Sequence, residues 1–168
     1  MNYEIRRLIP DDAEKVREVR LEGLRLHPEA FSRDYEQDEQ LSLDDWRMRL
    51  DGGWAWFGGF EGEMLLGIAA FGRGDSSKTR HVGHLGAMYV RKIARGTGLA
   101  DGIIEAVLDH AMGKVEQVQL TVTAGNIRAL KLYERCGFKI VGTLPRALLI
   151  GDKYYDEHLM ARPLSTSD

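Results

Sequence analysis

A turn in the middle of the chain combines glycine with basic residues in a pattern that suits an anion. Gly96 and Gly98 have no Cβ, so they can adopt a positive φ and let a ligand approach the backbone closely. Three cations, Arg91, Lys92 and Arg95, lie beside them. A helical pattern begins directly after the turn, and the first N–H groups of a helix lack intrahelical partners and lie at the positive end of its dipole. The turn is therefore predicted to cradle a diphosphate group.

Two other phosphate-binding motifs do not fit this turn. A P-loop ends in Gly-Lys followed by Ser or Thr, but the Gly-Lys pair of this chain, Gly113–Lys114, is followed by Val115. A dinucleotide-binding turn needs a third Gly or Ala where this chain has Asp101. ATP held by a P-loop and NAD are therefore disfavoured. An ordinary packing turn remains the alternative, because a pair of glycines is a weak signal on its own.

The turn has to be positioned by the elements on either side of it. His81–Val90 is predicted to be a strand, and the residues after the turn carry apolar side chains at helical spacing as far as Ala111. Further helices are predicted from Pro10 to about His27, over Asp44–Leu50 and from Asn126. The other predicted strands are Tyr3–Leu8, Gly53–Phe60, Met64–Gly72, Gln117–Thr123, Phe138–Gly142, Ala147–Ile150 and Tyr154–Ala161.

The turn resembles motif A of the GNAT superfamily of acyl-CoA N-acyltransferases, which reads Arg or Gln, two residues, Gly, one residue, then Gly or Ala. Here these positions are Arg95, Gly98 and Ala100. One departure is Lys92, where the family often has Pro. About thirty residues further on, a segment is similar to the family's second signature, Asn-x-x-Ala-x-x-Leu-Tyr-x-x-x-Gly-Phe, at Asn126, Ala129, Leu132, Tyr133, Gly137 and Phe138. Two motifs in this order are more specific than either alone, and the resemblance covers nearly the whole chain, most weakly from Leu26 to Leu50.

The resemblance implies a single domain over residues 1–168 of the α/β (α+β) class. It implies a mixed, mostly antiparallel central sheet with helices on both faces, and splayed strands that form an acyl-CoA cleft. Acetyl-CoA is the implied co-substrate, with its diphosphate on the turn and its pantetheine arm along the end of the central strand. The implied donor-binding residues are Met88, Tyr89, Val90, Arg95, Gly96, Thr97, Gly98, Leu99, Ala100, Asn126 and Ala129.

Two residues are candidates for proton transfer in an acetyl transfer. By the resemblance, Tyr133 faces the thioester sulfur and acts as general acid, since a phenol with a pKa near 10 keeps its proton at neutral pH. His84 on the central strand is the candidate general base, because histidine titrates in the useful range. The alternatives are a tyrosine that only packs in the core and a histidine that only fills a strand position. Cys136 as an acyl-carrying nucleophile is disfavoured, because no partner set lies beside it, so direct transfer is expected.

The acceptor is expected to be a primary amine of a small molecule, an amino acid or a peptide. The resemblance implies that the weakly matched region shapes the acceptor pocket, with Phe31, Tyr35 and Trp46 as candidate substrate-binding residues. The alternative is that these aromatic residues only pin a surface loop to the core. Two rival functions stay open, a protein N-terminal acetyltransferase and a non-catalytic acyl-CoA sensor or interaction module.

Composition sets the remaining expectations. The chain has 168 residues, a net charge of −3 and a pI near 6.0, which argues against nucleic-acid binding. A single cysteine excludes an intramolecular disulfide, and no apolar run approaches the 18 residues of a membrane span. No metal and a cytoplasmic setting are expected. Exposed strand edges near Tyr154 make a homodimer plausible, and Ser165–Asp168 is expected to fray.

Overall fold

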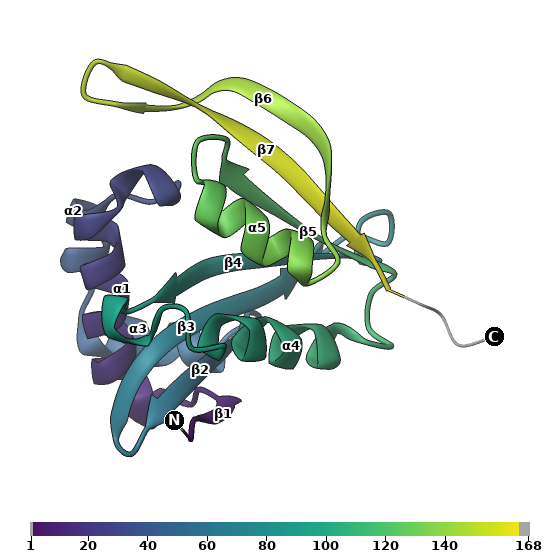
Figure 1. The fold of residues 1–168 in the computed structure, drawn as a ribbon. Coiled ribbons are helices and arrows are strands. Elements are labelled where there is room, and N and C mark those ends of the chain that lie inside the picture. The colour runs from purple at the N-terminus through teal and green to yellow at the C-terminus, as the bar shows by residue number, and fades with distance from the viewer. Residues whose placement is uncertain (1, 165–168) are drawn as a thin grey trace.

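The computed structural model describes residues 2–164, and its core is one sheet with helices against both faces (Figure 1). The expected fraying of Ser165–Asp168 concerns residues outside this range. The strands are β1 (Glu4–Arg7), β2 (Ala55–Glu61), β3 (Met64–Arg73), β4 (Val82–Val90), β5 (Gln117–Thr123), β6 (Lys139–Ile150) and β7 (Lys153–Pro163). The helices are α1 (Ala13–Leu26), α2 (Tyr35–Glu39), α3 (Leu43–Asp51), α4 (Leu99–Ala111) and α5 (Ile127–Arg135).

The sheet is mixed and mostly antiparallel, which confirms the predicted fold class. Within the described chain its seven strands run in the order β1-β2-β3-β4-β5-β7-β6, and β4–β5 is the parallel pair. That pair extends over three positions, from Val82 opposite Gln117 to His84 opposite Gln119. Beyond His84 the two strands separate, while β4 stays paired with β3 and β5 with β7. The sheet is therefore split along one line, between the C-terminal halves of β4 and β5.

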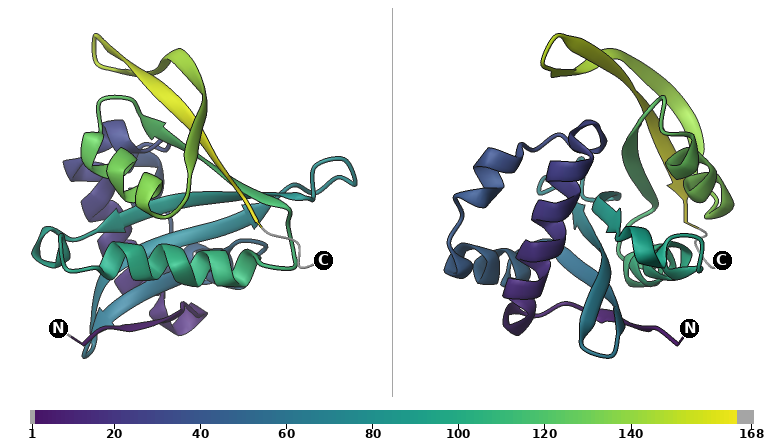
Figure 2. Two further views of the ribbon diagram at one scale, coloured as in Figure 1. Left: turned by 45° about the vertical axis from the view of Figure 1, so that its right-hand side comes forward. Right: turned by 60° about the vertical axis from the view of Figure 1, so that its left-hand side comes forward.

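Helices lie against both faces of the sheet (Figure 2). An apolar core on each face holds them there. Helix α4 packs on one face, where Ile103 and Val107 are fully buried, and α5 joins the same core through Leu130. Helices α1 and α3 pack on the other face through residues that include Val16 and Trp46. The helical spacing of these apolar residues is what directs each helix face to the sheet. The expected helices on both faces are thus confirmed.

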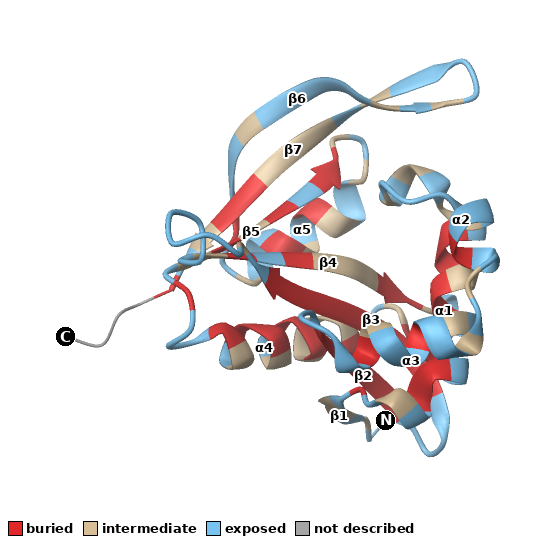
Figure 3. Ribbon diagram, turned by 180° about the vertical axis from the view of Figure 1, so that it is seen from behind, coloured by how far each residue is buried: buried red, intermediate tan, exposed pale blue. Residues whose placement is uncertain are grey.

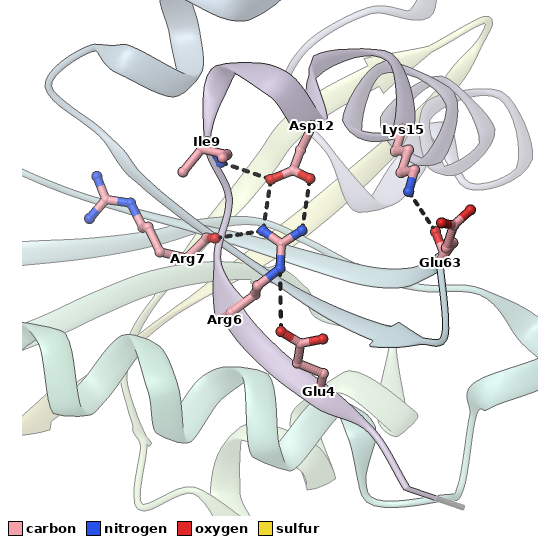
Figure 4. Close-up of polar contacts among 7 residues, drawn as sticks. All are labelled: Glu4, Arg6, Arg7, Ile9, Asp12, Lys15 and Glu63. Carbon is pink, nitrogen blue, oxygen red and sulfur yellow. Dashed lines mark hydrogen bonds and ion pairs between the residues drawn. The ribbon is translucent and has the colours of Figure 1, made fainter.

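The first strand and the first helix are tied together by one buried carboxylate (Figure 4). Asp12 lies in a 3-10 turn at Pro10–Asp12 that precedes α1, and its two oxygens accept from both terminal nitrogens of Arg6 at 2.8 and 2.9 Å. The backbone N–H of Ile9 also donates to Asp12, at 2.9 Å. The hydrogen bonds from Arg6 hold the pKa of Asp12 below its ordinary value, although burial opposes them. This contact fixes where α1 starts over the sheet.

Two parts of the chain differ from the sequence prediction. Helix α2 falls in the weakly matched region from Leu26 to Leu50, at a place where no helix was predicted because the sequence has little apolar periodicity. The helix is held instead by Asp38, which is fully buried among arginines. Strand β6 is continuous where two separate strand segments were predicted. It carries a register shift against β7 between Leu144 and Leu148, and Arg146 has a positive φ of 52° there.

The hairpin of β6 and β7 projects beyond the rest of the sheet, and most of β6 is exposed (Figure 3). Its outer edge pairs with no other strand in residues 2–164. The homodimer expected from such edges stays a prediction. No helix in this part of the chain is long and apolar enough to cross a membrane.

Candidate active site

A cleft of about 520 Å³ lies where β4 and β5 separate. Because β4 and β5 are parallel, their C-terminal ends meet at the same edge of the sheet, and the helices that follow them, α4 and α5, both begin there. This topology brings the glycine turn and the segment that starts at Asn126 to one cavity, although they are far apart in sequence. Its size falls in the range typical of small-molecule sites.

The glycine turn forms one end of the cleft and leaves backbone N–H groups available. Helix α4 begins at Leu99, and its N-cap residue Gly98 has a left-handed φ of 88°. Gly96 has a φ of 75°, and a Cβ on either glycine would meet nothing within 4 Å, so conformation rather than space calls for glycine there. No side chain caps this helix. Its first N–H groups therefore keep the capacity to bind an anion.

The free edge of β4 forms the long wall of the cleft. Met88, Tyr89 and Val90 line it, after a bulge at which Ala87 has a positive φ of 53°. Past His84 this edge has no strand partner on the β5 side. An extended ligand that carries amides can therefore pair with it as an added strand would.

The opposite wall comes from α5, and two of its residues have defined roles in local structure. Asn126 is the N-cap, with its Oδ1 accepting from the backbone N–H of Ala129 at 3.2 Å, so its amide nitrogen remains free to donate. Tyr133 lines the cleft with 8% of its surface exposed, and its ring packs edge-on against Phe138 with centroids 6.0 Å apart. Burial raises the pKa of Tyr133, which keeps the phenol protonated. Within residues 2–164 we find no hydrogen-bond partner for this hydroxyl.

Comparison with known sequences decides the family. The sequence model of the acetyltransferase (GNAT) family matches residues 18–138. The chain belongs to this family. It is 32% identical over 114 residues to N-acetylaspartate synthetase of Xenopus tropicalis, covering 67% of this chain and 41% of that protein. It is 30% identical over 70 residues to L-amino acid N-acetyltransferase AaaT of Escherichia coli K12, covering 40% of this chain and 43% of that protein. The chain thus matches less than half the length of either relative.

Solved structures of GNAT proteins share the fold. The acetyltransferase of the GNAT family from Streptococcus pneumoniae aligns with a TM-score of 0.87 at 24% identity, over 97% of this chain and 100% of that chain. The yncA protein of Salmonella typhimurium, solved with its cofactor acetyl-CoA, aligns with a TM-score of 0.87 at 18% identity, over 100% of this chain and 97% of that chain.

Most of the predicted site residues lie together at the cleft. Those lining it are Phe31, Met88, Tyr89, Val90, Arg95, Gly96, Gly98, Ala100, Asn126, Ala129 and Tyr133. Two predicted donor-binding side chains do not line it. Leu99 is 1% exposed in the core under α4, so only its backbone faces the turn. The hydroxyl of Thr97 donates to the carbonyl of Ala94 at 2.6 Å and accepts from Tyr3 at 2.9 Å, which turns it toward β1.

Among the acceptor-side candidates, the structure contradicts Trp46. Trp46 has no exposed surface and belongs to the core between α1, α3 and the sheet, so a substrate cannot touch it. Tyr35 lies outside the cleft and donates to Glu39 at 3.3 Å. Phe31 does line the cleft, beside Ala30. His84 is exposed and is not among the cleft-lining residues, since it stands at the last position where β4 still pairs with β5.

Sequence reasoning missed several residues of the cleft wall. They are His27, Ala30, Asp101, Thr121, Val122, Thr123, Arg128, Leu132 and Arg135. The splayed strands expected from the family resemblance implied that the end of β5 faces the cleft. This expectation could have been used to predict Thr121–Thr123 as lining residues. Nothing in the sequence indicated that the end of α1 reaches over the cleft, as His27 does. No group of three or more His, Cys, Asp or Glu side chains gathers into a metal site within the described range.

Proposed function

We propose that the chain transfers an acetyl group from acetyl-CoA to the primary amine of a small molecule, in the first instance a free amino acid. The observation that carries the proposal is the separation of β4 from β5, which opens one cleft walled by both GNAT signature segments and by Tyr133. The amino acid is favoured because both curated relatives are named for N-acetylated amino acids or for amino-acid acetylation.

The residues present fit acetyl-CoA. The uncapped N–H groups at the start of α4 and the cation Arg95 suit a diphosphate, and the open edge of Met88–Val90 suits an arm that carries amides. Asn126 has a free amide donor at the start of α5. Bound there, acetyl-CoA supplies an acetyl group activated as a thioester.

Direct transfer balances with these residues. The amine nitrogen forms a bond to the carbonyl carbon, the carbon–sulfur bond breaks, and the sulfur leaves with the electron pair. Tyr133 donates its phenolic proton to that sulfur, and the resulting phenolate takes up the second proton, which the nitrogen loses as the amide forms. The acceptor ammonium must lose a proton to become nucleophilic. We assign this proton to solvent at the open cleft. His84, which does not line the cleft, would take part only through intervening water.

A melting-temperature panel with acetyl-CoA, CoA, NAD and ATP tests the donor site. A ligand at 100 times its Kd stabilises the fold by about 2.7 kcal/mol, a rise in Tm of roughly 5–10 °C at this size. We expect this rise with the two CoA species and not with NAD or ATP. If neither CoA species shifts the melt, the turn is a packing turn and the proposal fails.

Thiol release in the presence of candidate acceptors then separates the remaining functions. Faster release with free amino acids than with peptides supports the proposed acceptor, and preference for peptide N-termini would indicate a protein N-terminal acetyltransferase. CoA binding without release for any amine would indicate a sensor. In the same assay, a His84→Ala variant that keeps the wild-type pH profile of kcat would remove His84 from proton transfer.

A further inference from the structure

Arg95 presents a positive charge at the cleft that no carboxylate in the described residues neutralises. Its Nε donates to the carbonyl oxygen of Val90 at 3.0 Å, and its guanidinium carbon lies 5.7 Å from the centre of the Tyr89 ring. Its Nη2 lies 3.2 Å from Nε2 of His27. Arg95 and His27 both line the cleft. The guanidinium is thus held by a carbonyl and an imidazole, and its charge remains available to an anion.

The contact with His27 specifies the protonation state of the imidazole. A guanidinium has only donors, so Nη2 of Arg95 must donate, and Nε2 of His27 must offer a lone pair. The ring proton of neutral His27 then lies on Nδ1. The carboxylate of Glu29 is 3.8 Å from Nδ1, and its negative charge favours a proton on that nitrogen. The geometry therefore describes a neutral His27 with a defined tautomer.

The fold fixes His27 firmly enough for this contact to matter. His27 is the C-cap of α1, where its backbone N–H donates to the carbonyl of Gly23 at 2.9 Å. Gly23 lets α1 lie directly on β4, since a Cβ there would stand 2.9 Å from the Tyr89 ring. Glu29 follows in a short 3-10 turn, and its backbone carbonyl accepts a hydrogen bond from the hydroxyl of Thr123 at the end of β5. The imidazole is thus anchored between α1 and both walls of the cleft.

We propose that neutral His27 is a positioning residue that holds the Arg95 guanidinium where it meets the donor's diphosphate. This inference rests on the proposed function. Protonation of His27 removes the lone pair that Arg95 uses and places two cations 3.2 Å apart. Arg95 then loses one of its hydrogen-bond partners, and donor affinity falls.

The charged and titratable groups that face His27 decide the direction of the pH effect. Arg95 opposes protonation from 3.2 Å, and Glu29 favours it from 3.8 Å. Tyr89 faces the ring with centroids 6.1 Å apart, and burial raises its pKa, so it stays neutral. A proton on Nε2 of His27 would remove the acceptor that Arg95 uses, so donor affinity is expected to fall as the pH is lowered.

A double-mutant cycle on CoA binding tests whether His27 acts through Arg95. We expect His27→Ala to raise the Kd for CoA about fivefold at pH 8, and His27→Gln, whose amide oxygen can accept the same hydrogen bond, to restore most of the affinity. In an Arg95→Met background His27→Ala should leave the Kd unchanged. An equal loss of affinity in both backgrounds overturns the proposal, because His27 would then act independently of Arg95.

The pH dependence provides a readout that a purely structural role would not change. The ligand is dephospho-CoA, because it lacks the phosphate monoester whose own titration near pH 6 would interfere. We expect its Kd to rise several-fold from pH 8 to pH 5.5 for wild type and to stay constant for His27→Gln. A lower Kd at pH 5.5 overturns the proposal and makes protonated His27 a direct diphosphate ligand. If wild type does not bind CoA at pH 8, the proposed function itself fails. This outcome differs from those that contradict the role of His27, so the two failures can be distinguished.

Discussion

The phenol of Tyr133, the proposed general acid, lies at the cleft. It has no hydrogen-bond partner that we find in residues 2–164, and its ring is fixed against Phe138. Burial raises its pKa above the ordinary value near 10. The proton is therefore retained in the folded protein at least to pH 10, and loss of this proton cannot lower kcat between pH 7 and 10.

Removal of this hydroxyl tests the catalytic assignment. We expect Tyr133→Phe to lower kcat by about 10²-fold or more, the typical contribution of a positioned acid. The KM for acetyl-CoA should change little, because the ring still fills its place in the core. Steady-state thiol release measures both constants. Tyr154→Phe, on the exposed hairpin, is the matched control and should leave them unchanged. Equal turnover by Tyr133→Phe would exclude the phenol from the mechanism.

At the scale of single residues, the sequence predicted the positions that the signatures define and missed those set by packing. Arg95, Asn126 and Tyr133 lie at the cleft as the motif spacing indicated. Trp46 was a wrong candidate, because an aromatic residue on an amphipathic helix looks the same whether its face meets a core or a ligand. His27 was missed for a related reason, since its role depends on how α1 crosses β4 rather than on any local pattern.

Among the elements, α4 is the one whose start is proposed to bind the donor through backbone N–H groups rather than through a side chain. Gly98 takes the left-handed conformation at the N-cap, and the start of the helix lines the cleft at Gly98 and Ala100. The strand, turn and helix were predicted close to their observed bounds, because apolar periodicity and glycine are strong local signals. Helix α2 was not predicted, since its anchor is a single buried charge.

A substitution at Gly98 tests the turn as an element. We expect Gly98→Ala to lower the free energy of unfolding by about 1–2 kcal/mol, because its φ of 88° is unfavourable for a residue with a Cβ. The Kd for CoA should rise as well, since relaxation of the strain moves the N–H groups. Urea unfolding and CoA titration measure the two effects. Gly53→Ala is the control, because Gly53 is exposed, has no positive φ and leaves room for a Cβ. Unchanged stability and affinity of Gly98→Ala would contradict the described turn.

For the molecule as a whole, the arrangement of the elements explains why two distant motifs share one site. β4 followed by α4 and β5 followed by α5 are parallel neighbours, so both helix starts reach the same edge of the sheet. The sequence indicated the class of sheet through the family resemblance. It did not indicate that β7 inserts between β5 and β6, because strand order depends on pairings between segments that local patterns do not specify.

The helices on one face of the sheet are joined by a single buried carboxylate. Asp38 of α2 has no exposed surface and lies 2.7 Å from Arg33, 3.2 Å from Arg49 of α3 and 3.6 Å from Arg20 of α1. Burial acts to raise the pKa of Asp38, but the hydrogen bonds from Arg49 and Arg33 outweigh it and leave the pKa below its ordinary value. Burial lowers the pKa of Arg20 to about 10, so this guanidinium is still charged at neutral pH. The charged form of Asp38 is therefore the one that the fold stabilises.

This cluster predicts a specific loss of stability in acid. A folded-state pKa below the unfolded value near 3.9 gives stabilisation that is complete above that value and is lost as the pH falls through the folded-state pKa. We expect Asp38→Asn to lower the free energy of unfolding by about 3–5 kcal/mol at pH 7, because three arginines lose their common counter-charge. The difference from wild type should narrow at pH 3, because Asp38 in the unfolded chain, with its ordinary pKa near 3.9, binds a proton at that pH. Urea unfolding at pH 7 and pH 3 measures this difference in the free energy of unfolding, with the exposed Asp34→Asn as control.

A second variant applies if Asp38→Asn does not fold at pH 7. Arg33→Met removes one half-exposed partner of Asp38 and should lower the free energy of unfolding by less, and its difference from wild type should also be smaller at pH 3. An equal loss at both pH values would mean that the carboxylate charge does not hold this layer together.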